Sequence, residues 1–154
     1  MINPLVLDGQ TALVTGASSG LGRHFSLTLA KAGAKVAVCA RRTDKLASLV
    51  EEIEAFDGRA MAFAMDVTDV DSIAAAVDGA ETELGPIAVL VNNAGLSVQK
   101  HAVDMTPEDY DLVVDTNQKG AYFTAVEVGK RMIAHGHGGS IINIASVAGL
   151  RPLG

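Results

Sequence analysis

Short apolar runs alternate with longer amphipathic segments along the chain. Five runs are apolar nearly throughout: Thr11–Thr15, Lys35–Ala40, Ala60–Met65, Ile87–Val91 and Ser140–Ile144. Strands without polar alternation are typical of parallel sheets that are covered on both faces. The pattern therefore predicts five buried parallel strands.

The segments between these runs have helical periodicity, with apolar residues three or four positions apart. The expected buried faces are Leu21, Phe25, Leu29 and Ala32 in the first helix, Leu46, Leu49, Ile53 and Phe56 in the second, and Val70, Ile73, Val77 and Leu84 in the third. Each helix follows a predicted strand, which favours crossover connections between parallel strands.

Capping residues mark where the helices begin. Thr43 precedes the second helix, and Thr68 with Asp71 suggests a cap for the third. A fourth, long helix is expected from Pro107 to about His135, with Thr106 as its cap and proline in its first turn. Asn117 and Gly120 are weak helix formers inside it and predict a local distortion.

Alternating strands and helices predict an α/β fold in three layers, with helices on both faces of a doubly wound, Rossmann-like parallel sheet. The expected strand order is 3-2-1-4-5. The 154 residues suit one domain, which we assign to 1–154.

Composition narrows the classes of partner. Hydrophobic residues make up 49% of the chain and the formal net charge is −6, which argues against general binding to nucleic acid or to an anionic membrane. The apolar runs are too short to cross a bilayer, and the first residues do not resemble a signal peptide. A soluble cytoplasmic protein is therefore expected. The single cysteine, Cys39, permits no internal disulfide and is expected to be a buried apolar residue.

A glycine-rich loop follows the first predicted strand. Gly16 permits a tight turn, Gly20 permits close approach of a pyrophosphate, and Gly22 permits close packing of helix on sheet. Ser18, Ser19 and Leu21 complete the loop, and the helix N-terminus offers free N–H groups and partial positive charge. The position of the loop predicts dinucleotide binding.

The end of the second strand indicates which dinucleotide binds. An acid there would bind the ribose 2′-hydroxyl group of NAD, but the residue is Ala40. Arg41 and Arg42 follow, and guanidinium groups suit a 2′-phosphate. We therefore expect NADP, with NAD as the less favoured cofactor, and we expect Arg41 to contribute more than Arg42.

Two further strand ends lie at the same predicted edge. Asp66 and Val67 follow the third strand and are expected to contact adenine, although Asp66 also suits the cap of the next helix. Asn93, Ala94 and Gly95 follow the fourth strand, where an amide links strand ends and small residues leave space for a flat ring.

In order and spacing, these motifs resemble those of the short-chain dehydrogenase/reductase family. The resemblance rests on Thr15–Gly22, Asp66-Val67, Asn92–Gly95, Asn117 and Ile142–Ser146. It implies hydride transfer between a nicotinamide and a carbonyl or alcohol substrate. It also implies a catalytic role for Asn117, whose backbone holds a water, and for Ser146, whose hydroxyl polarises the substrate carbonyl.

The family's Tyr-xxx-Lys pair does not occur within the 154 residues, because neither Tyr110 nor Tyr122 has a lysine four positions later. The chain is expected to be the amino-terminal portion of such a reductase and to be inactive alone. It would then leave the fifth strand at an open edge and favour self-association. The alternative is a dinucleotide-binding fragment without turnover.

Other features add little. His135 and His137 lie among glycines without a third ligand nearby, so we predict a flexible turn and no metal site. Lys100 and His101 are placed at the edge of the substrate pocket. The expected partners are a small carbonyl or alcohol substrate and further copies of the chain. A methyltransferase would need an acid where Ala40 stands.

Overall fold

A computed structural model describes residues 6–149, whose strands form one sheet in the order β3-β2-β1-β4-β5. The strands are β1 (Thr11–Thr15), β2 (Lys35–Ala40), β3 (Arg59–Ala64), β4 (Ile87–Asn92) and β5 (Ser140–Asn143). Every neighbouring pair is parallel. The predicted strand order and direction are confirmed.

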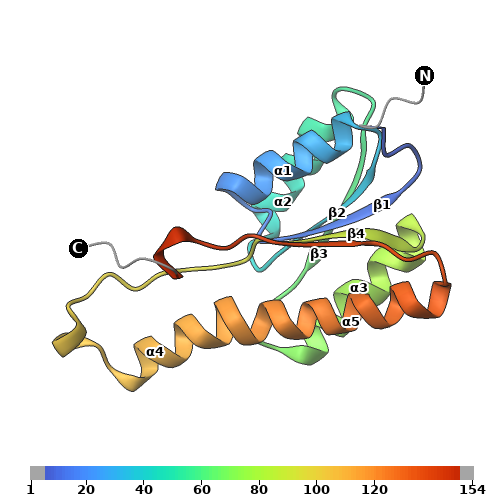
Figure 1. The fold of residues 1–154 in the computed structure, drawn as a ribbon. Coiled ribbons are helices and arrows are strands. Elements are labelled where there is room, and N and C mark those ends of the chain that lie inside the picture. Colours follow the sequence, from blue (N-terminus) through green and yellow to red (C-terminus); the bar gives the residue numbers. More distant parts are fainter. Residues whose placement is uncertain (1–5, 150–154) are drawn as a thin grey trace.

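Helices cover both faces of the sheet, as the alternating pattern predicts. They are α1 (Gly20–Lys31), α2 (Thr43–Glu54), α3 (Val70–Leu84), α4 (Pro107–Val114) and α5 (Ala121–His135). Figure 1 shows α1 and α2 on one face, with α3 and the α4–α5 rod on the other. The three-layer α/β/α architecture is confirmed.

The core consists of two apolar layers because alternate residues of each central strand face opposite helices. Ala12 and Val14 of β1 pack in the α1–α2 layer, whereas Leu13 packs in the α3–α5 layer. All three side chains are completely buried. This two-sided burial explains why the central strands carry no polar alternation.

Burial on both faces does not extend to the edges of the sheet. Successive residues of β3 alternate in burial, and all four residues of β5 are exposed. Ile141, Ile142 and Ile144 are 41%, 47% and 37% exposed. The expectation of five strands buried on both faces is therefore wrong for β3 and β5, because each has a neighbouring strand on one side only.

The buried face of α1 is only partly the predicted one. Phe25 and Leu29 pack against the core as expected, but Leu21 is 60% exposed, and the buried residues are Gly22, Ser26 and Ala30. Small side chains let this helix lie close to the sheet, and the Ser26 hydroxyl donates to the Gly22 carbonyl at 2.8 Å. Val70 of α3 is likewise exposed.

Two of the predicted helix starts are displaced by one residue. Asp69 caps α3 by accepting from the backbone N–H of Asp71, and the Thr68 hydroxyl instead donates to Asp66. Thr43 is the first residue of α2, so that Arg42 occupies the capping position. At α4, Thr106 is the cap as predicted, and Asp109 completes a reciprocal capping box with it.

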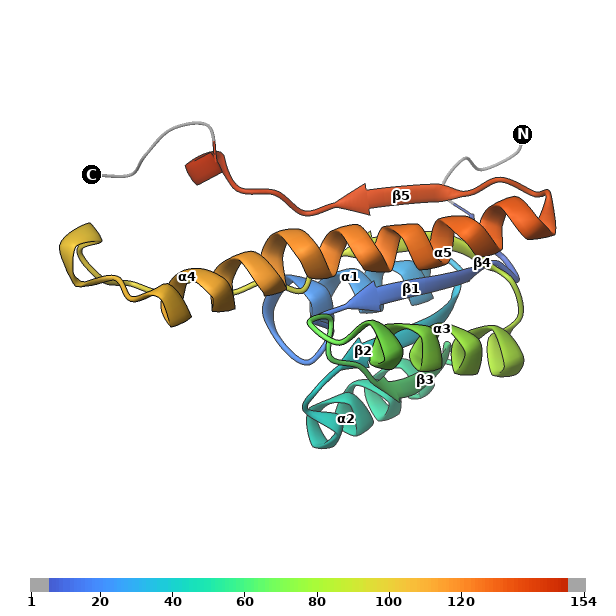
Figure 2. The same ribbon diagram turned by 90° about the horizontal axis from the view of Figure 1, so that it is seen from below.

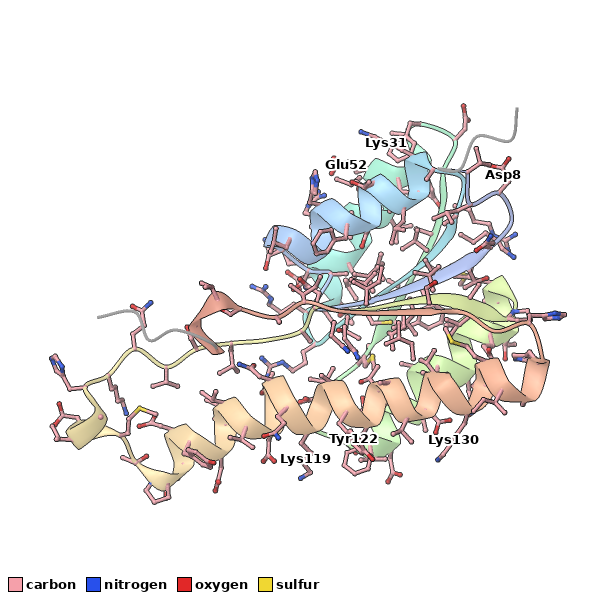
Figure 3. All side chains as sticks on the ribbon, viewed as in Figure 1. Asp8, Lys31, Glu52, Lys119, Tyr122 and Lys130 are labelled. Carbon is pink, nitrogen blue, oxygen red and sulfur yellow. The ribbon has the colours of Figure 1, made fainter. Side chains whose placement is uncertain are left out.

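The predicted distortion of the long helix is a π-helical segment, Asp115–Gly120, between α4 and α5. Helix α4, the π segment and α5 together form a rod that extends past the sheet, as Figure 2 shows. Lys119, Tyr122 and Lys130 lie on the side of the rod that faces away from the sheet (Figure 3). Among the described residues, no helix is both long and apolar enough to cross a membrane.

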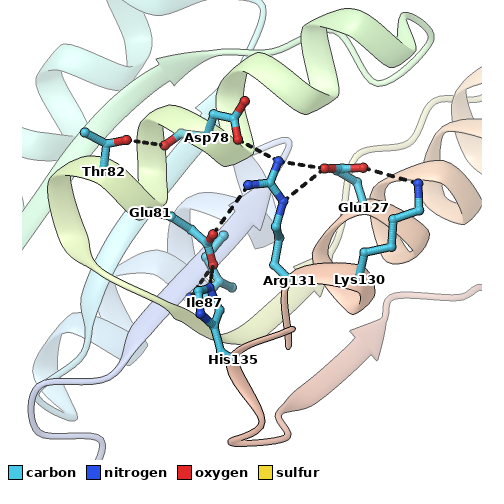
Figure 4. Close-up of polar contacts among 8 residues, drawn as sticks. All are labelled: Asp78, Glu81, Thr82, Ile87, Glu127, Lys130, Arg131 and His135. Carbon is cyan, nitrogen blue, oxygen red and sulfur yellow. Dashed lines mark hydrogen bonds and ion pairs between the residues drawn. The ribbon is translucent and has the colours of Figure 1, made fainter. Parts of the chain in front are cut away.

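Ion pairs fix the far end of the rod to α3, whose Glu81 is in turn hydrogen-bonded to β4 (Figure 4). Arg131 lies 2.6 Å from Asp78 and 3.8 Å from Glu81. His135 Nε2 lies 3.0 Å from Glu81 Oε1, which also accepts the backbone N–H of Ile87. The prediction of a flexible turn is thus wrong for His135, which ends α5 against a carboxylate.

Candidate functional site

A cleft of about 490 Å³ opens where the carboxyl ends of the central strands meet. Its lining comes from the glycine-rich loop and from the ends of β2, β3 and β4: Gly16, Ser18, Ser19, Leu21, Cys39, Ala40, Arg41, Arg42, Met65, Asp66, Val67, Asn93, Ala94, Gly95, Leu96 and Thr116. Both its volume and its position at strand carboxyl ends are typical of ligand sites in such sheets.

Close packing of the glycine-rich loop on the next strand end defines one wall of the cleft. Gly16 has φ +65°, and a Cβ added there would lie 2.8 Å from the Cα of Ala94. A Cβ at Gly22 would lie 2.4 Å from the Gly16 carbonyl oxygen. Both positions therefore require glycine. At Gly20, by contrast, a Cβ would meet no atom within 4 Å, so the backbone there faces open space.

The buried hydroxyl of Thr15 joins the glycine-rich loop to the end of β4. Its Oγ accepts the backbone N–H groups of Asn93 and Ala94, both at 3.0 Å. The amide of Asn93 donates to the carbonyls of Thr15 and Gly16. Thr15 is not among the site residues expected from the sequence, although a hydroxyl at the end of a buried strand must find hydrogen-bond partners there.

The two arginines after β2 take different positions. Arg42 Nη2 donates to the hydroxyls of Ser18 and Ser19 at 2.9 and 3.0 Å, across the mouth of the cleft. Arg41 also lines the cleft, and its charge acts on Asp66. Among the described residues, neither guanidinium group has a carboxylate within ion-pair distance, so both positive charges remain available to a ligand.

Asp66 forms a tight turn at the end of β3. Its Oδ1 accepts the backbone N–H of Thr68 at 3.0 Å and the Thr68 hydroxyl at 2.8 Å. The pKa of Asp66 lies below its ordinary value, first because of the Thr68 backbone N–H and also because of the Arg41 charge. Asp66 is therefore ionised at neutral pH, and both Asp66 and Val67 line the cleft.

Asn117 lies in the π segment and pairs with Leu96. Its Nδ2 donates to the Leu96 carbonyl at 2.8 Å, and its Oδ1 accepts the Leu96 N–H at 2.9 Å. The side-chain amide is thus occupied, while the preceding Thr116 lines the cleft. Leu96 and Thr116 are lining residues that the sequence did not suggest, because no motif marks them.

Ser146 is exposed and follows β5, where its Oγ accepts the backbone N–H of Ala148 at 3.2 Å. The side-chain amide of Asn92 connects β5, which precedes Ser146, to the rod. Its Nδ2 donates to the carbonyl of Ala121, directly after the π segment, and to Oδ1 of Asn143, the last residue of β5. Asn92 therefore contacts both segments that carry the candidate catalytic residues.

Four expected site residues are not part of the cleft lining: Gly20, Gly22, Asn117 and Ser146. Lys100 and His101, which we place at the edge of the substrate pocket, are not in the lining either. Lys100 instead pairs with Asp109 at 2.5 Å, beside the cap of α4. His101 is exposed in the loop before that cap. The remaining expected cofactor residues all meet at the cleft.

Comparison with known proteins agrees with this arrangement. The chain is 40% identical over 150 residues to L-rhamnose 1-dehydrogenase (NAD(P)(+)) from Azotobacter vinelandii, covering 95% of the chain and 59% of that protein. A short-chain dehydrogenase/reductase from Mycobacterium marinum superposes with TM-score 0.94 at 38% identity, over 97% of this chain and 60% of that one. The actinorhodin polyketide ketoreductase with NADPH superposes with TM-score 0.89 at 36% identity, over 94% of this chain and 56% of that one.

The chain spans less than two thirds of the length of each of these proteins. The short chain dehydrogenase family model matches residues 10–154, which is nearly the whole chain. The glycine-rich loop, the Asn92–Gly95 turn and Asn117 all lie within this match. The chain belongs to the short chain dehydrogenase family.

Proposed function

We propose that the chain forms the cofactor-binding part of an NADP-preferring oxidoreductase acting on a carbonyl or alcohol substrate. The observation that carries this proposal is the cleft shared by the glycine-rich loop and the end of β4, joined through Thr15. The relatives, among them a dehydrogenase of L-rhamnose and a polyketide ketoreductase, support the reaction class.

The residues of the cleft fit a dinucleotide. The open backbone at Gly20 and the N-terminus of α1 suit a pyrophosphate, with Gly16, Gly22 and Leu21 shaping the approach. On the far side, Asp66 and Val67 flank the adenine, while Ala94 and Gly95 leave room for the nicotinamide ring. When bound, the cofactor supplies or accepts a hydride.

The preference for NADP is supported by the chemistry at the end of β2. Ala40 has no carboxylate that could accept a bond from a ribose hydroxyl or repel a phosphate. Arg41 and Arg42 add two positive charges at the cleft, where Arg41 also acts on Asp66; among the described residues neither arginine has a carboxylate within ion-pair distance. One relative is an NAD(P)(+) dehydrogenase and one structural neighbour was solved with NADPH, which is consistent with use of the phosphorylated cofactor or of both cofactors.

We assign Ser146 to polarising the substrate carbonyl and Asn117 to holding a water with its backbone. The bonds between the Asn117 side-chain amide and Leu96 support a backbone role, because both polar atoms of the side chain already have partners. The proton donor is not assigned to Tyr110 or Tyr122, both of which are exposed side chains of the rod.

We further propose that the working protein is a cytoplasmic homo-oligomer. The support for association is that several large apolar side chains of the rod are exposed, among them Leu112, Tyr122 and Ile133 at 46%, 63% and 82%. Exposed apolar surface that gathers in one place is typical of sites that contact another protein.

The test follows NADPH oxidation with a panel of ketones and aldehydes. It compares the 154-residue chain with a form extended past Gly154 to the length of the relatives. We expect turnover from the extended form and negligible turnover from this chain, because a positioned acid/base contributes roughly 10²–10⁴-fold.

Dinucleotide binding is measured on both forms by titration calorimetry. Binding by both without turnover by either would favour the alternative, a dinucleotide-binding protein that is not an enzyme. Equal turnover from both forms would contradict the assignment of proton transfer to residues outside this chain.

A further inference from the structure

We propose that Asn92 and Thr124 together bind one buried water molecule at the joint where β4, β5 and the rod meet. Asn92 is the last residue of β4 and is 5% exposed, and Thr124 lies in α5 and is completely buried. Neither residue is part of the cleft lining. The water site is therefore separate from the cofactor cleft, and it does not depend on the proposed function.

Two buried oxygens at this joint lack hydrogen-bond partners. They are Asn92 Oδ1 and Thr124 Oγ, and within residues 6–149 no other buried side-chain nitrogen or oxygen lacks a partner. A buried polar atom without a partner is costly in free energy, and most such atoms in folded proteins bond to the protein or to an ordered water. Two such atoms on neighbouring elements point to a partner that they share.

The other bonds of the Asn92 side chain fix the direction of Oδ1. Nδ2 donates to the carbonyl of Ala121 and to Oδ1 of Asn143, both at 3.0 Å. Turning the amide over would place Oδ1 against the Ala121 carbonyl, which is an acceptor against an acceptor. Oδ1 therefore keeps its direction and needs a donor there.

The packing of α5 on β4 brings Thr124 to the level of Asn92. Leu90 and Val128 belong to the same core layer, between the sheet and the rod. Two residues along a strand and four along a helix cover nearly the same distance, about 6.6 and 6.0 Å. Because β4 and β5 are parallel, the helix between them runs in the opposite direction, and the next pair toward the cleft is Asn92 and Thr124. The bond from Asn92 to Ala121, in the same helical turn as Thr124, agrees with this register.

The Thr124 hydroxyl differs from those of two other helical threonines. Thr28 in α1 and Thr82 in α3 each donate to the backbone carbonyl four residues earlier, at 2.9 and 2.8 Å. Thr124 makes no such bond to any described residue, so its hydroxyl can still donate and accept. A water that donates to Asn92 Oδ1 and bonds to this hydroxyl has the two polar partners that a buried water needs.

The water completes a set of contacts that joins three segments through one side chain. Asn92 Nδ2 holds the first residue of α5 and the last residue of β5, and the water adds Thr124 in the first turn of α5. The π segment directly precedes this turn, and Ser146 follows three residues after β5. Both segments that carry candidate catalytic residues therefore depend on the same joint. This water is distinct from the one assigned to the Asn117 backbone, because Thr124 is completely buried.

The test compares Thr124→Val, which removes the hydroxyl at nearly constant volume, with Thr124→Ser, which keeps it. Thr82→Val is the matched control, because the Thr82 hydroxyl bonds within its own helix. Urea unfolding followed by circular dichroism gives the equilibrium constant of unfolding for each form. Rotating-frame Overhauser spectroscopy detects magnetisation transfer from a bound water to the side-chain amide protons of Asn92.

We expect Thr124→Val to raise the unfolding constant by roughly 5- to 30-fold, because it leaves the water and Asn92 Oδ1 short of a partner. Thr82→Val changes that constant by less than about threefold. Transfer from water to Asn92 is expected in the wild type and in Thr124→Ser, and it is lost in Thr124→Val.

A dry joint gives the opposite sign. Thr124→Val then lowers the unfolding constant, because it removes an unpartnered hydroxyl from apolar surroundings. That result would overturn the proposal, as would a wild-type spectrum without transfer from water to Asn92. If Thr124→Val does not fold, the spectra of the wild type and of Thr124→Ser decide the question by themselves.

Discussion

Single buried polar groups determine how the cleft is built. The hydroxyl of Thr15, which is 1% exposed, accepts two backbone N–H groups from the turn after β4. The amide of Asn93 returns two bonds to the backbone of the glycine-rich loop. Buried donors and acceptors without partners are costly, so these residues fix the turn in one conformation.

Cys39 also lines the cleft but is only 1% exposed. Its burial raises the pKa of the thiol to about 12. At pH 8 only a fraction on the order of 10⁻⁴ is thiolate, the form that reacts. The sequence-based expectation of a buried apolar residue is confirmed.

We therefore predict that Cys39 in the native chain resists alkylation and reacts at the rate of unfolding. Iodoacetamide labelling followed by mass spectrometry measures this, with Cys39→Ala as the unlabelled control. Because the folded state retains a proton that the unfolded state releases, the Cys39 contribution to the free energy of unfolding declines as pH rises above about 8.5. Rapid labelling in native buffer at pH 8 would contradict the prediction.

Among the elements, the π segment connects the rod to the cleft. Thr116 of this segment lines the cleft, Asn117 pairs with Leu96, and Gly120 packs on the end of β3. A π-helical turn inside an α-helix is rare and frequently occurs at functional sites. The local departure from α-helical geometry here coincides with the residue that the family resemblance marks as catalytic.

Alanine substitutions at two glycines of the rod test how tightly the π segment packs against its neighbours. A Cβ at Gly120 would lie 2.7 Å from the Val67 carbonyl oxygen, whereas a Cβ at Gly129, within α5, meets no atom within 4 Å. We expect Gly120→Ala to destabilise the chain by about 1–3 kcal/mol through overpacking.

The matched control Gly129→Ala should stabilise the chain by about 0.5–1 kcal/mol, because alanine is the better helix former. Urea unfolding followed by circular dichroism gives both values. A neutral Gly120→Ala would show that the π segment does not rest on the end of β3.

At the scale of the whole molecule, the two edges of the sheet differ. The β3 edge begins with Arg59 and alternates in burial, whereas β5 exposes Ile141 and Ile142, and Ile144 is exposed just after the strand. Exposed, apolar edge strands favour pairing with other chains.

We predict that the 154-residue chain self-associates through β5. Ile142→Lys should shift sedimentation velocity profiles toward the monomer, because it places a charge on the exposed edge. Val103→Lys is the control, since Val103 is 92% exposed but lies in a short 3-10 helix, Ala102–Asp104, before α4. An equal shift in both variants would indicate a general effect of charge on solubility instead.

The sequence by itself determined the parallel sheet, because apolar runs alternate with helical periodicity and crossover connections between parallel strands are right-handed. It also located the glycine-rich loop, where backbone geometry requires glycine, and it located the arginines after β2 and Asn117 by their places in the motifs. Only the tertiary structure decided that β5 is exposed and that Gly22, Ser26 and Ala30 form the buried part of α1, because burial depends on which elements cover a segment and small residues carry little hydrophobic signal. It also decided the partners of Thr15 and Arg42, which lie far away along the chain, and local patterns do not encode such contacts.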